Sequence, residues 1–309
     1  MPPSGCPAPP RSLVPRPNGA PGKLAVLPWA GFRGAVSYTF DDANASQIEH
    51  FPVLDALGVR MTFYLTTGKP EASDATWARA LARGHELGNH AKSHAMQASA
   101  EEIEAATAFI EETFGVRPRT MASPYGHASY TELARSRFLV NRGVGGSHVV
   151  PNDHTDPFYL PCYVPPANAR ARAFDERVHA ARADGAWLLV LVHGFLGGTD
   201  YAYQPIALEE FVASVEHARG FGDLWIDSVV NIAAYWRGQK AFAAATRTVT
   251  PERTTWTWEL PEHFPPGHFL RVTVGQGRLE QNGVPLVQDE RGYYEVALDA
   301  RSLTLASSV

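Results

Sequence analysis

Hydrophobic and polar positions along the chain predict strands and helices in alternation. Mainly apolar segments predict strands at residues 35–40 and 61–65. The continuous apolar run at 187–192 predicts a buried strand, because strands of a parallel sheet covered on both faces are apolar on both sides. Segments with helical spacing of apolar residues lie between them. Helices are expected over residues 46–57, 74–82, 99–114, 131–136, 167–183, 208–219 and 229–245, with further strands over 119–122, 138–140 and 223–226. This order predicts an α/β fold with a parallel sheet or a βα barrel.

The pattern changes near Thr246. From there, residues alternate with a period of two over 254–260, 269–274 and 293–298, and the turn signal Asn282-Gly283 separates two of these runs. We therefore expect an α/β domain over residues 24–246 and a small β-sandwich-like domain over 247–309. Trp256 and Trp258 share one strand face, which is expected to pack against the main domain.

The first 23 residues are rich in Pro and Gly and contain no apolar h-region, so they predict a disordered leader and not an intact signal peptide. No run reaches the roughly 18 apolar residues of a membrane span, and we expect a soluble protein. The two cysteines, Cys6 and Cys162, provide no disulfide framework. Compartment and oligomeric state stay open.

Net charge argues against a polyanionic partner. The formal charge is -5, and the Lys and Arg residues are spread along the chain without a basic stripe. Nucleic-acid binding needs such a stripe to neutralise phosphates. We therefore expect no nucleic-acid partner.

The strand over residues 34–40 leads into two adjacent carboxylates, Asp41 and Asp42. Two neighbouring acids at the end of a buried strand repel each other and lose hydration, and a divalent metal commonly offsets both costs. His90 and His94 are four residues apart, a spacing that one helical turn would place on the same side. Asp42, His90 and His94 are therefore predicted to form a metal site of two histidines and one carboxylate with open positions.

Further polar residues follow other predicted strands. They are Ser123-Pro124-Tyr125-Gly126 and His193-Gly194. In a parallel βα arrangement, the loops at the carboxyl ends of the strands build the active site. The coincidence of these segments with the two acids and two histidines predicts a metal-dependent hydrolase.

Four motifs in this order resemble a known family. The sequence T-F-D-D occupies residues 39–42, and H-[ST]-x-x-H matches residues 90–94 apart from Ala91. The motif R-x-P-[FY]-G matches residues 122–126 apart from its arginine, and an apolar strand ending in leucine and histidine matches Leu191 to His193 approximately. Over about residues 25–235 the chain resembles the polysaccharide deacetylases of the NodB-homology type, carbohydrate esterase family 4. It is similar to a subgroup with a C-terminal β appendage.

The resemblance implies a distorted (β/α) barrel with a small C-terminal all-β domain. It also implies Zn²⁺, or another divalent metal such as Co²⁺, at the three predicted ligands. Asp41 would be the general base, His193 the general acid, and the backbone N–H of Tyr125 an oxyanion donor. The implied substrate contacts are Pro124, Gly126, His127 and Tyr201, and Tyr203 is a further aromatic in the same loop as Tyr201.

Two departures from the family pattern concern the base and the acid. The arginine that neighbours the base in the family is Ala122 here. Arg142 follows the strand over 138–140 and emerges at the same rim, so it is expected to keep Asp41 ionised. No D-x-x-x-W motif supplies an acid to orient His193, and Asp153, Asp156 and Asp227 are all candidates.

The predicted function is removal of acetyl groups from an acetylated oligo- or polysaccharide, either as an O-acetyl ester or as an N-acetyl amide. Two alternatives stay open: a carbohydrate-binding protein on a decayed deacetylase scaffold, and a cyclic amide hydrolase on the same fold. A serine hydrolase is excluded because the chain has no G-x-S-x-G nucleophile elbow. The resemblance is compatible with an extracellular or periplasmic location.

Overall fold

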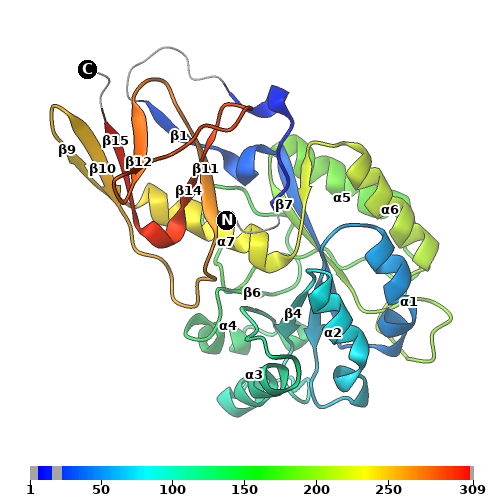
Figure 1. Cartoon of the computed structure of the whole chain (residues 1–309). Coiled ribbons are helices and arrows are strands. Elements are labelled where there is room, and N and C mark those ends of the chain that lie inside the picture. The colour runs from blue at the N-terminus through cyan, green and yellow to red at the C-terminus, as the bar shows by residue number, and fades with distance from the viewer. Residues whose placement is uncertain (1–5, 16–22, 307–309) are drawn as a thin grey trace.

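A curled parallel sheet forms the centre of the computed structural model, which describes residues 6–15 and 23–306 (Figure 1). Its strand order is β6-β5-β4-β3-β2-β7, and β8 also pairs with β2. The strands are β2 (Gly34–Asp41), β3 (Thr62–Leu65), β4 (Glu86–Asn89), β5 (Thr120–Ala122), β6 (Val140–Arg142), β7 (Trp187–Val192) and β8 (Leu224–Ile226). In β2 and β7 every residue is buried, which explains their continuous apolar pattern.

An irregular segment bridges the two edges of this sheet. Leu160 pairs with Arg142 of β6, and Tyr163 pairs with Val190 of β7, both in parallel orientation. The backbone N–H of Leu191 donates to the carbonyl of Tyr163 at 2.9 Å. The sheet therefore curls into a distorted barrel, which confirms the predicted fold class.

Helices cover the outside of the curled sheet (Figure 1). They are α1 (Ala45–Ala56), α2 (Ala75–Ala82), α3 (Ala100–Phe114), α4 (Ser129–Arg135), α5 (Ala171–Asp184), α6 (Leu208–Gly220) and α7 (Val229–Ala243). Their ends follow local sequence signals: the Ser99 side chain accepts a hydrogen bond from the Glu102 N–H at the start of α3, and Gly115 ends that helix with φ 71°. No helix within the described ranges is long and apolar enough to cross a membrane.

The C-terminal region is all β, as predicted. One sheet has the order β1-β11-β14 and the other β13-β12-β15-β10-β9. Their strands are β1 (Leu24–Val26), β9 (Thr246–Val249), β10 (Arg253–Thr257), β11 (Phe269–Val274), β12 (Arg278–Gln281), β13 (Val284–Pro285), β14 (Tyr294–Ala297) and β15 (Ser302–Ala306).

The C-terminal sheets do not form a separate unit with its own core. Trp258 is buried against Phe242 of α7, with ring centroids 5.4 Å apart, and the same apolar cluster includes Trp187 of the barrel. At the N-terminal side, Leu24 of β1 pairs with Val274 of β11. The expected boundary at residue 24 is therefore not observed, because β1 belongs to a C-terminal sheet.

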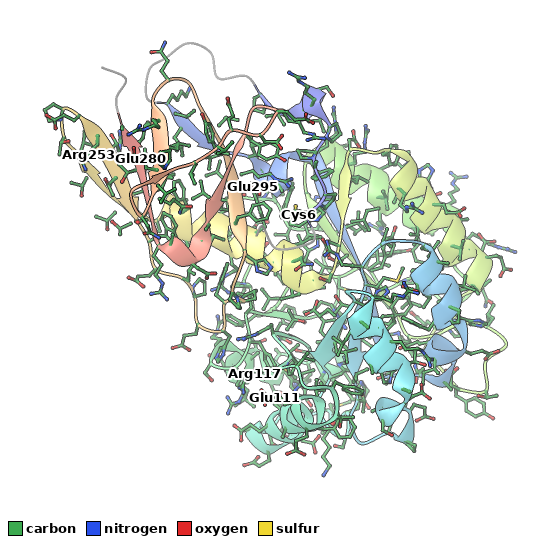
Figure 2. All side chains as sticks on the ribbon, viewed as in Figure 1. Cys6, Glu111, Arg117, Arg253, Glu280 and Glu295 are labelled. Carbon is green, nitrogen blue, oxygen red and sulfur yellow. The ribbon has the colours of Figure 1, made fainter. Side chains whose placement is uncertain are left out.

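Part of the expected leader has a defined place in the fold. The carbonyls of Cys6 and Pro7 accept hydrogen bonds from the Arg271 guanidinium, and Cys6 lies over the C-terminal strands near Glu295 (Figure 2). Val14 is buried with Leu27 and Tyr293. For residues 6–15 the prediction of disorder is wrong, because these residues have packing partners far along the sequence. Residues 1–5 and 16–22 of the leader lie outside the described residues.

Candidate active site

The two adjacent carboxylates line one cleft at the carboxyl end of the barrel. Asp41 is the last residue of β2, and the chain then turns through Asp42 and Ala43, whose φ angles are 77° and 55°. Consecutive side chains of a straight strand would point to opposite faces, so this left-handed turn allows both acids to face the same space. The cleft has a volume of about 620 Å³.

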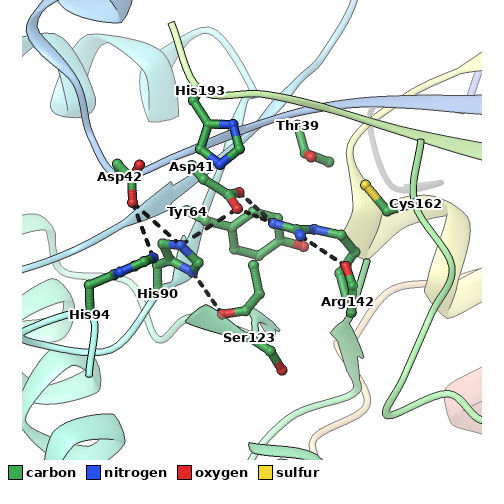
Figure 3. A network of polar contacts seen from close by, with 12 residues as sticks. Thr39, Asp41, Asp42, Tyr64, His90, His94, Ser123, Arg142, Cys162 and His193 are labelled. Carbon is green, nitrogen blue, oxygen red and sulfur yellow. Dashed lines mark hydrogen bonds and ion pairs between the residues drawn. The ribbon is translucent and has the colours of Figure 1, made fainter. Parts of the chain in front are cut away.

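His90 and His94 reach the same cleft from a loop. The expected helical turn is wrong: β4 ends at Asn89, and both Ala91 and His94 have positive φ angles, 60° and 56°. The Asn89 side chain accepts a hydrogen bond from the Ala91 N–H at 2.8 Å and supports this bend. The Nε2 atoms of both histidines lie 3.5 Å from Asp42 Oδ1 (Figure 3).

The chemistry of these three residues fits a metal ion. Their donor atoms all lie within 4.8 Å of one another. Nδ1 of His90 is 2.8 Å from the Ala122 carbonyl, so it carries the proton and leaves Nε2 as the electron-pair donor. Within the described part of the chain, this buried Nε2 has no hydrogen-bond partner. Burial and the neighbouring His90 lower the pKa of His94, which favours its neutral, metal-binding form.

Asp41 is buried against Arg142. The guanidinium contacts both carboxylate oxygens of Asp41 through Nη2 and donates through Nη1 to the Gly143 carbonyl at 2.9 Å (Figure 3). Burial alone would raise the pKa of Asp41, but the charges of Arg142 and of two nearby histidines hold it below its ordinary value. The same pair raises the pKa of Arg142 despite its complete burial. The structure thus places Arg142 beside Asp41 and on the face of the Tyr64 ring, at 5.5 Å from its centroid.

His193 directly follows β7 and lines the same cleft as Asp41. Its carbonyl accepts hydrogen bonds from the Asn44 and Gln47 side chains, both at 2.7 Å, which fix the backbone. Burial lowers the pKa of the imidazole, while Asp41 and Asp42 act in the opposite direction. The ring lies edge to face with the Tyr203 ring, at 5.2 Å between centroids.

The three acids proposed to orient His193 are engaged elsewhere. Asp153 accepts from the N–H groups of Val150 and Thr155, and Asp156 pairs with Arg135. Asp227 pairs with Arg60 at 2.6 Å. The carboxylates that act on the His193 imidazole in the structure are instead Asp41 and Asp42.

Tyr125 and Gly126 form the rim next to the histidines. Tyr125 adopts φ 56°, and its half-exposed ring lies 4.4 Å from that of His94. A Cβ at Gly126 would come within 2.2 Å of Val144, so this position requires glycine. Pro124 is buried behind them and does not line the cleft.

Two predicted substrate contacts point elsewhere. His127 is exposed and bonded to the Ser129 hydroxyl at 2.8 Å, and Tyr201 is fully exposed to solvent. Neither lines the cleft, because the left-handed turn at Tyr125 and Gly126 directs His127 outward and Tyr201 stands at the tip of its loop. The tyrosine of this loop that does line the cleft is Tyr203, two positions after Tyr201. Apolar lining comes from Val144, Val164 and Leu191.

Comparisons with known proteins bear on the family and the fold. Residues 32–139 match the family model described as polysaccharide deacetylase. A solved structure from Mycobacterium smegmatis, provisionally described as a polysaccharide deacetylase, is 19% identical, covers 80% of this chain and 98% of its own, and has a TM-score of 0.50. One from Pseudomonas aeruginosa PAO1, with the same provisional description, is 14% identical, covers 69% and 94%, and has a TM-score of 0.53. No match to a curated protein was found.

The fold is thus shared with these structures. The family match covers β2 to β5, which carry Asp41, Asp42, His90 and His94. Residues 32–139 are thus similar to the polysaccharide deacetylase family, which is the family that the sequence motifs resemble.

Proposed function

We propose that the protein is a divalent-metal-dependent deacetylase that removes acetyl groups from an acetylated carbohydrate. The observation that carries this proposal is the convergence on one cleft of the Asp42, His90 and His94 donor atoms with the buried Asp41 carboxylate. Three protein ligands with further positions open are typical of catalytic zinc sites. Zn²⁺ is the expected metal, and Co²⁺ is a second candidate.

When bound, the metal supplies Lewis acidity toward the acetyl carbonyl and toward the attacking water. His90 is prepared for this role by its hydrogen bond to the Ala122 carbonyl, which fixes the tautomer. His94 keeps an exposed fraction of 25%, so the ligand set is accessible from the cleft.

Asp41 takes the proton from the attacking water. It must be ionised to do so, and the Arg142 guanidinium secures this by lowering its pKa. The buried Arg142 guanidinium contacts the Asp41 carboxylate and so holds it in one orientation. Arg142 is therefore a positioning residue in the place of the family arginine missing at Ala122.

His193 donates a proton to the leaving oxygen or nitrogen. Its backbone is fixed by Asn44 and Gln47, and its ring faces the same cleft as Asp41. The backbone N–H of Tyr125 is the proposed donor to the oxyanion, since the turn at φ 56° lies beside His94. The acid, the base and the oxyanion donor thus surround one space.

Acetate release tests this function. The purified protein, loaded with Zn²⁺, is incubated separately with acetylated xylan, chitooligosaccharides and peptidoglycan, and free acetate is measured. Release from at least one substrate is expected, and it identifies the acetyl linkage. A cyclic amide such as a hydantoin serves as the rival substrate. Hydrolysis of that amide without any acetate release would assign the cyclic amide alternative instead.

A further inference from the structure

An exposed tyrosine stands beside the proposed acid. Tyr203 keeps 62% of its side chain exposed while lining the cleft. Its ring is perpendicular to that of His193, at an interplanar angle of 83°. The described exposed aromatic residues are Tyr125, Tyr201 and Tyr203, and two of these three line the cleft.

The loop that carries Tyr203 is anchored at both ends. The Leu196 N–H donates to the Ile206 carbonyl at 2.8 Å, and the Ile206 N–H donates to the Gly194 carbonyl at 3.2 Å. In the middle of the loop, Asp200 accepts a hydrogen bond from the Ser46 N–H at the start of α1, at 2.7 Å. These bonds fix the loop against the barrel.

Close packing restricts this loop further. A Cβ at Gly194 would lie 2.6 Å from the Ser46 hydroxyl, and one at Gly198 would lie 2.7 Å from the Ser46 Cβ. Gln204, which lines the cleft next to Tyr203, adopts φ 48°, a conformation that costs free energy for a residue other than glycine. Strained residues of this kind concentrate at ligand sites.

Packing in the core does not explain why an aromatic ring stands at position 203. Its apolar body is mainly in contact with solvent, so it contributes little to the core. Aromatic rings held rigidly at a cleft bind ligands well because they present a large amphipathic surface with few rotatable bonds. The apolar face of a pyranose ring matches such a surface, and the adjacent Gln204 amide offers hydrogen bonds to sugar hydroxyls.

We infer that Tyr203 forms a sugar-binding subsite on the leaving-group side of the cleft. The inference rests on the proposed function, because the leaving group is the sugar that His193 protonates. The Tyr203 ring stacks on the pyranose ring that carries the acetyl group or on its neighbour in the chain. It binds the sugar and leaves the acetyl group to the metal ligands.

Two substrates distinguish sugar binding by Tyr203 from an effect of Tyr203 on His193. One is the acetylated oligosaccharide with the highest wild-type activity, and the other is triacetin, a small acetate ester without a ring. Tyr203→Ala is expected to reduce kcat/KM for the oligosaccharide by about tenfold or more, mainly through KM, because it removes an aromatic anchor. Activity on triacetin is expected to change by less than about twofold, since no sugar is present.

Matched variants complete the experiment. Tyr203→Phe keeps the ring and is expected to behave like the wild type on both substrates. Tyr201→Ala removes an exposed ring of the same loop that does not line the cleft, and it should also leave both activities unchanged. Equal losses on both substrates in Tyr203→Ala would overturn the inference, because they would mean that Tyr203 acts through His193.

An unchanged KM for the oligosaccharide in Tyr203→Ala would also overturn it. If the wild type releases no acetate from any substrate, the proposed function fails, and the subsite is then tested by calorimetric titration with an acetylated chitooligosaccharide. Weaker binding to Tyr203→Ala than to Tyr201→Ala supports the subsite, and equal binding contradicts it.

Discussion

Two buried arginines, Arg142 in the barrel and Arg271 in a C-terminal sheet, have different roles. Arg142 lies inside the barrel and pairs with Asp41, whose side chain is 3% exposed. Arg271 lies in the C-terminal sheet and pairs with Glu295, whose side chain is 32% exposed. Burying both Arg142 and Asp41 costs the free energy of removing two charges from water. Glu295 avoids much of this cost because it stays partly hydrated.

The remaining donors of the two guanidinium groups also differ. Arg271 donates to the carbonyls of Cys6, Pro7 and Ala30, so it fastens chain segments together. Arg142 donates to one carbonyl, and its Nε has no partner within the described residues. The comparison indicates that Arg271 is structural, whereas Arg142 serves the carboxylate at the active site.

The largest expected effect comes from removing the C-terminal strands, including the one that carries Arg271. A chain that ends at Ala245 loses the strands that cover Phe242 and leaves β1 unpaired. Loss of a single buried aromatic residue such as Trp258 costs about 3 to 5 kcal/mol, so the truncated protein is expected to be insoluble. Soluble yield and thermal unfolding measure this. A stable, soluble truncation would show that the two halves fold independently.

Substituting the two acids separates catalysis from structure. Asp41→Asn is expected to lower turnover by about 10² to 10⁴-fold while metal content is retained, since it removes a positioned general base. Glu295→Gln is the matched control and should leave turnover unchanged, because Glu295 pairs with Arg271 in a C-terminal sheet and does not line the cleft. Acetate release and metal analysis distinguish the two. Near-normal turnover in Asp41→Asn would place the base elsewhere.

Substituting the two arginines tests stability. In the metal-free protein, Arg142→Met is expected to destabilise the fold by about 3 to 5 kcal/mol, because it leaves a buried carboxylate unpaired. In Arg271→Met, Glu295 stays partly hydrated, so its loss of a partner costs little stability. The main cost is that three backbone carbonyls lose their hydrogen-bond donor, at about 1 to 3 kcal/mol of stability each. Urea unfolding measures both. Arg142→Lys keeps the charge and should recover part of the stability.

The smallest effect concerns pH. Because Arg142 lowers the pKa of Asp41, Arg142→Met should raise that pKa and shift the acidic limb of the kcat/KM profile to higher pH. Arg271→Met should leave the limb unchanged. The stability that Asp41 contributes is present above its unfolded pKa of about 3.9 and is lost as pH falls through the lower folded value. An unshifted limb in Arg142→Met would mean that the metal alone keeps the base ionised.

Much of this arrangement follows from the sequence. Buried strands are readable as apolar runs, and polar residues at their ends predicted Asp41, Asp42, His90 and His94 in one place. Arg142 was expected just after a strand over residues 138–140; it is the last residue of β6 and contacts Asp41 as expected. These features depend on the period of a strand and on the direction of a parallel sheet, which are local properties.

Other features depend on contacts that the sequence does not encode locally. The spacing of His90 and His94 suggested a helical turn, but a bend with positive φ angles forms instead. The loop that carries Tyr201 and Tyr203 is held by contacts that are distant in sequence, such as the hydrogen bond from the Ser46 N–H to Asp200. Within residues 6–15, Pro7 is held by Arg271, which is 264 positions away in sequence, and Val14 is buried with Tyr293.

Metal content in a pair of histidine variants tests the central claim most directly. Wild-type protein is expected to bind about one equivalent of zinc, and His94→Ala should lose it, since a missing ligand removes most of the affinity of a three-ligand site. His127→Ala is the control, because His127 is exposed and bonded to Ser129 outside the cleft, and it should keep the metal. Full zinc occupancy in His94→Ala would contradict the account.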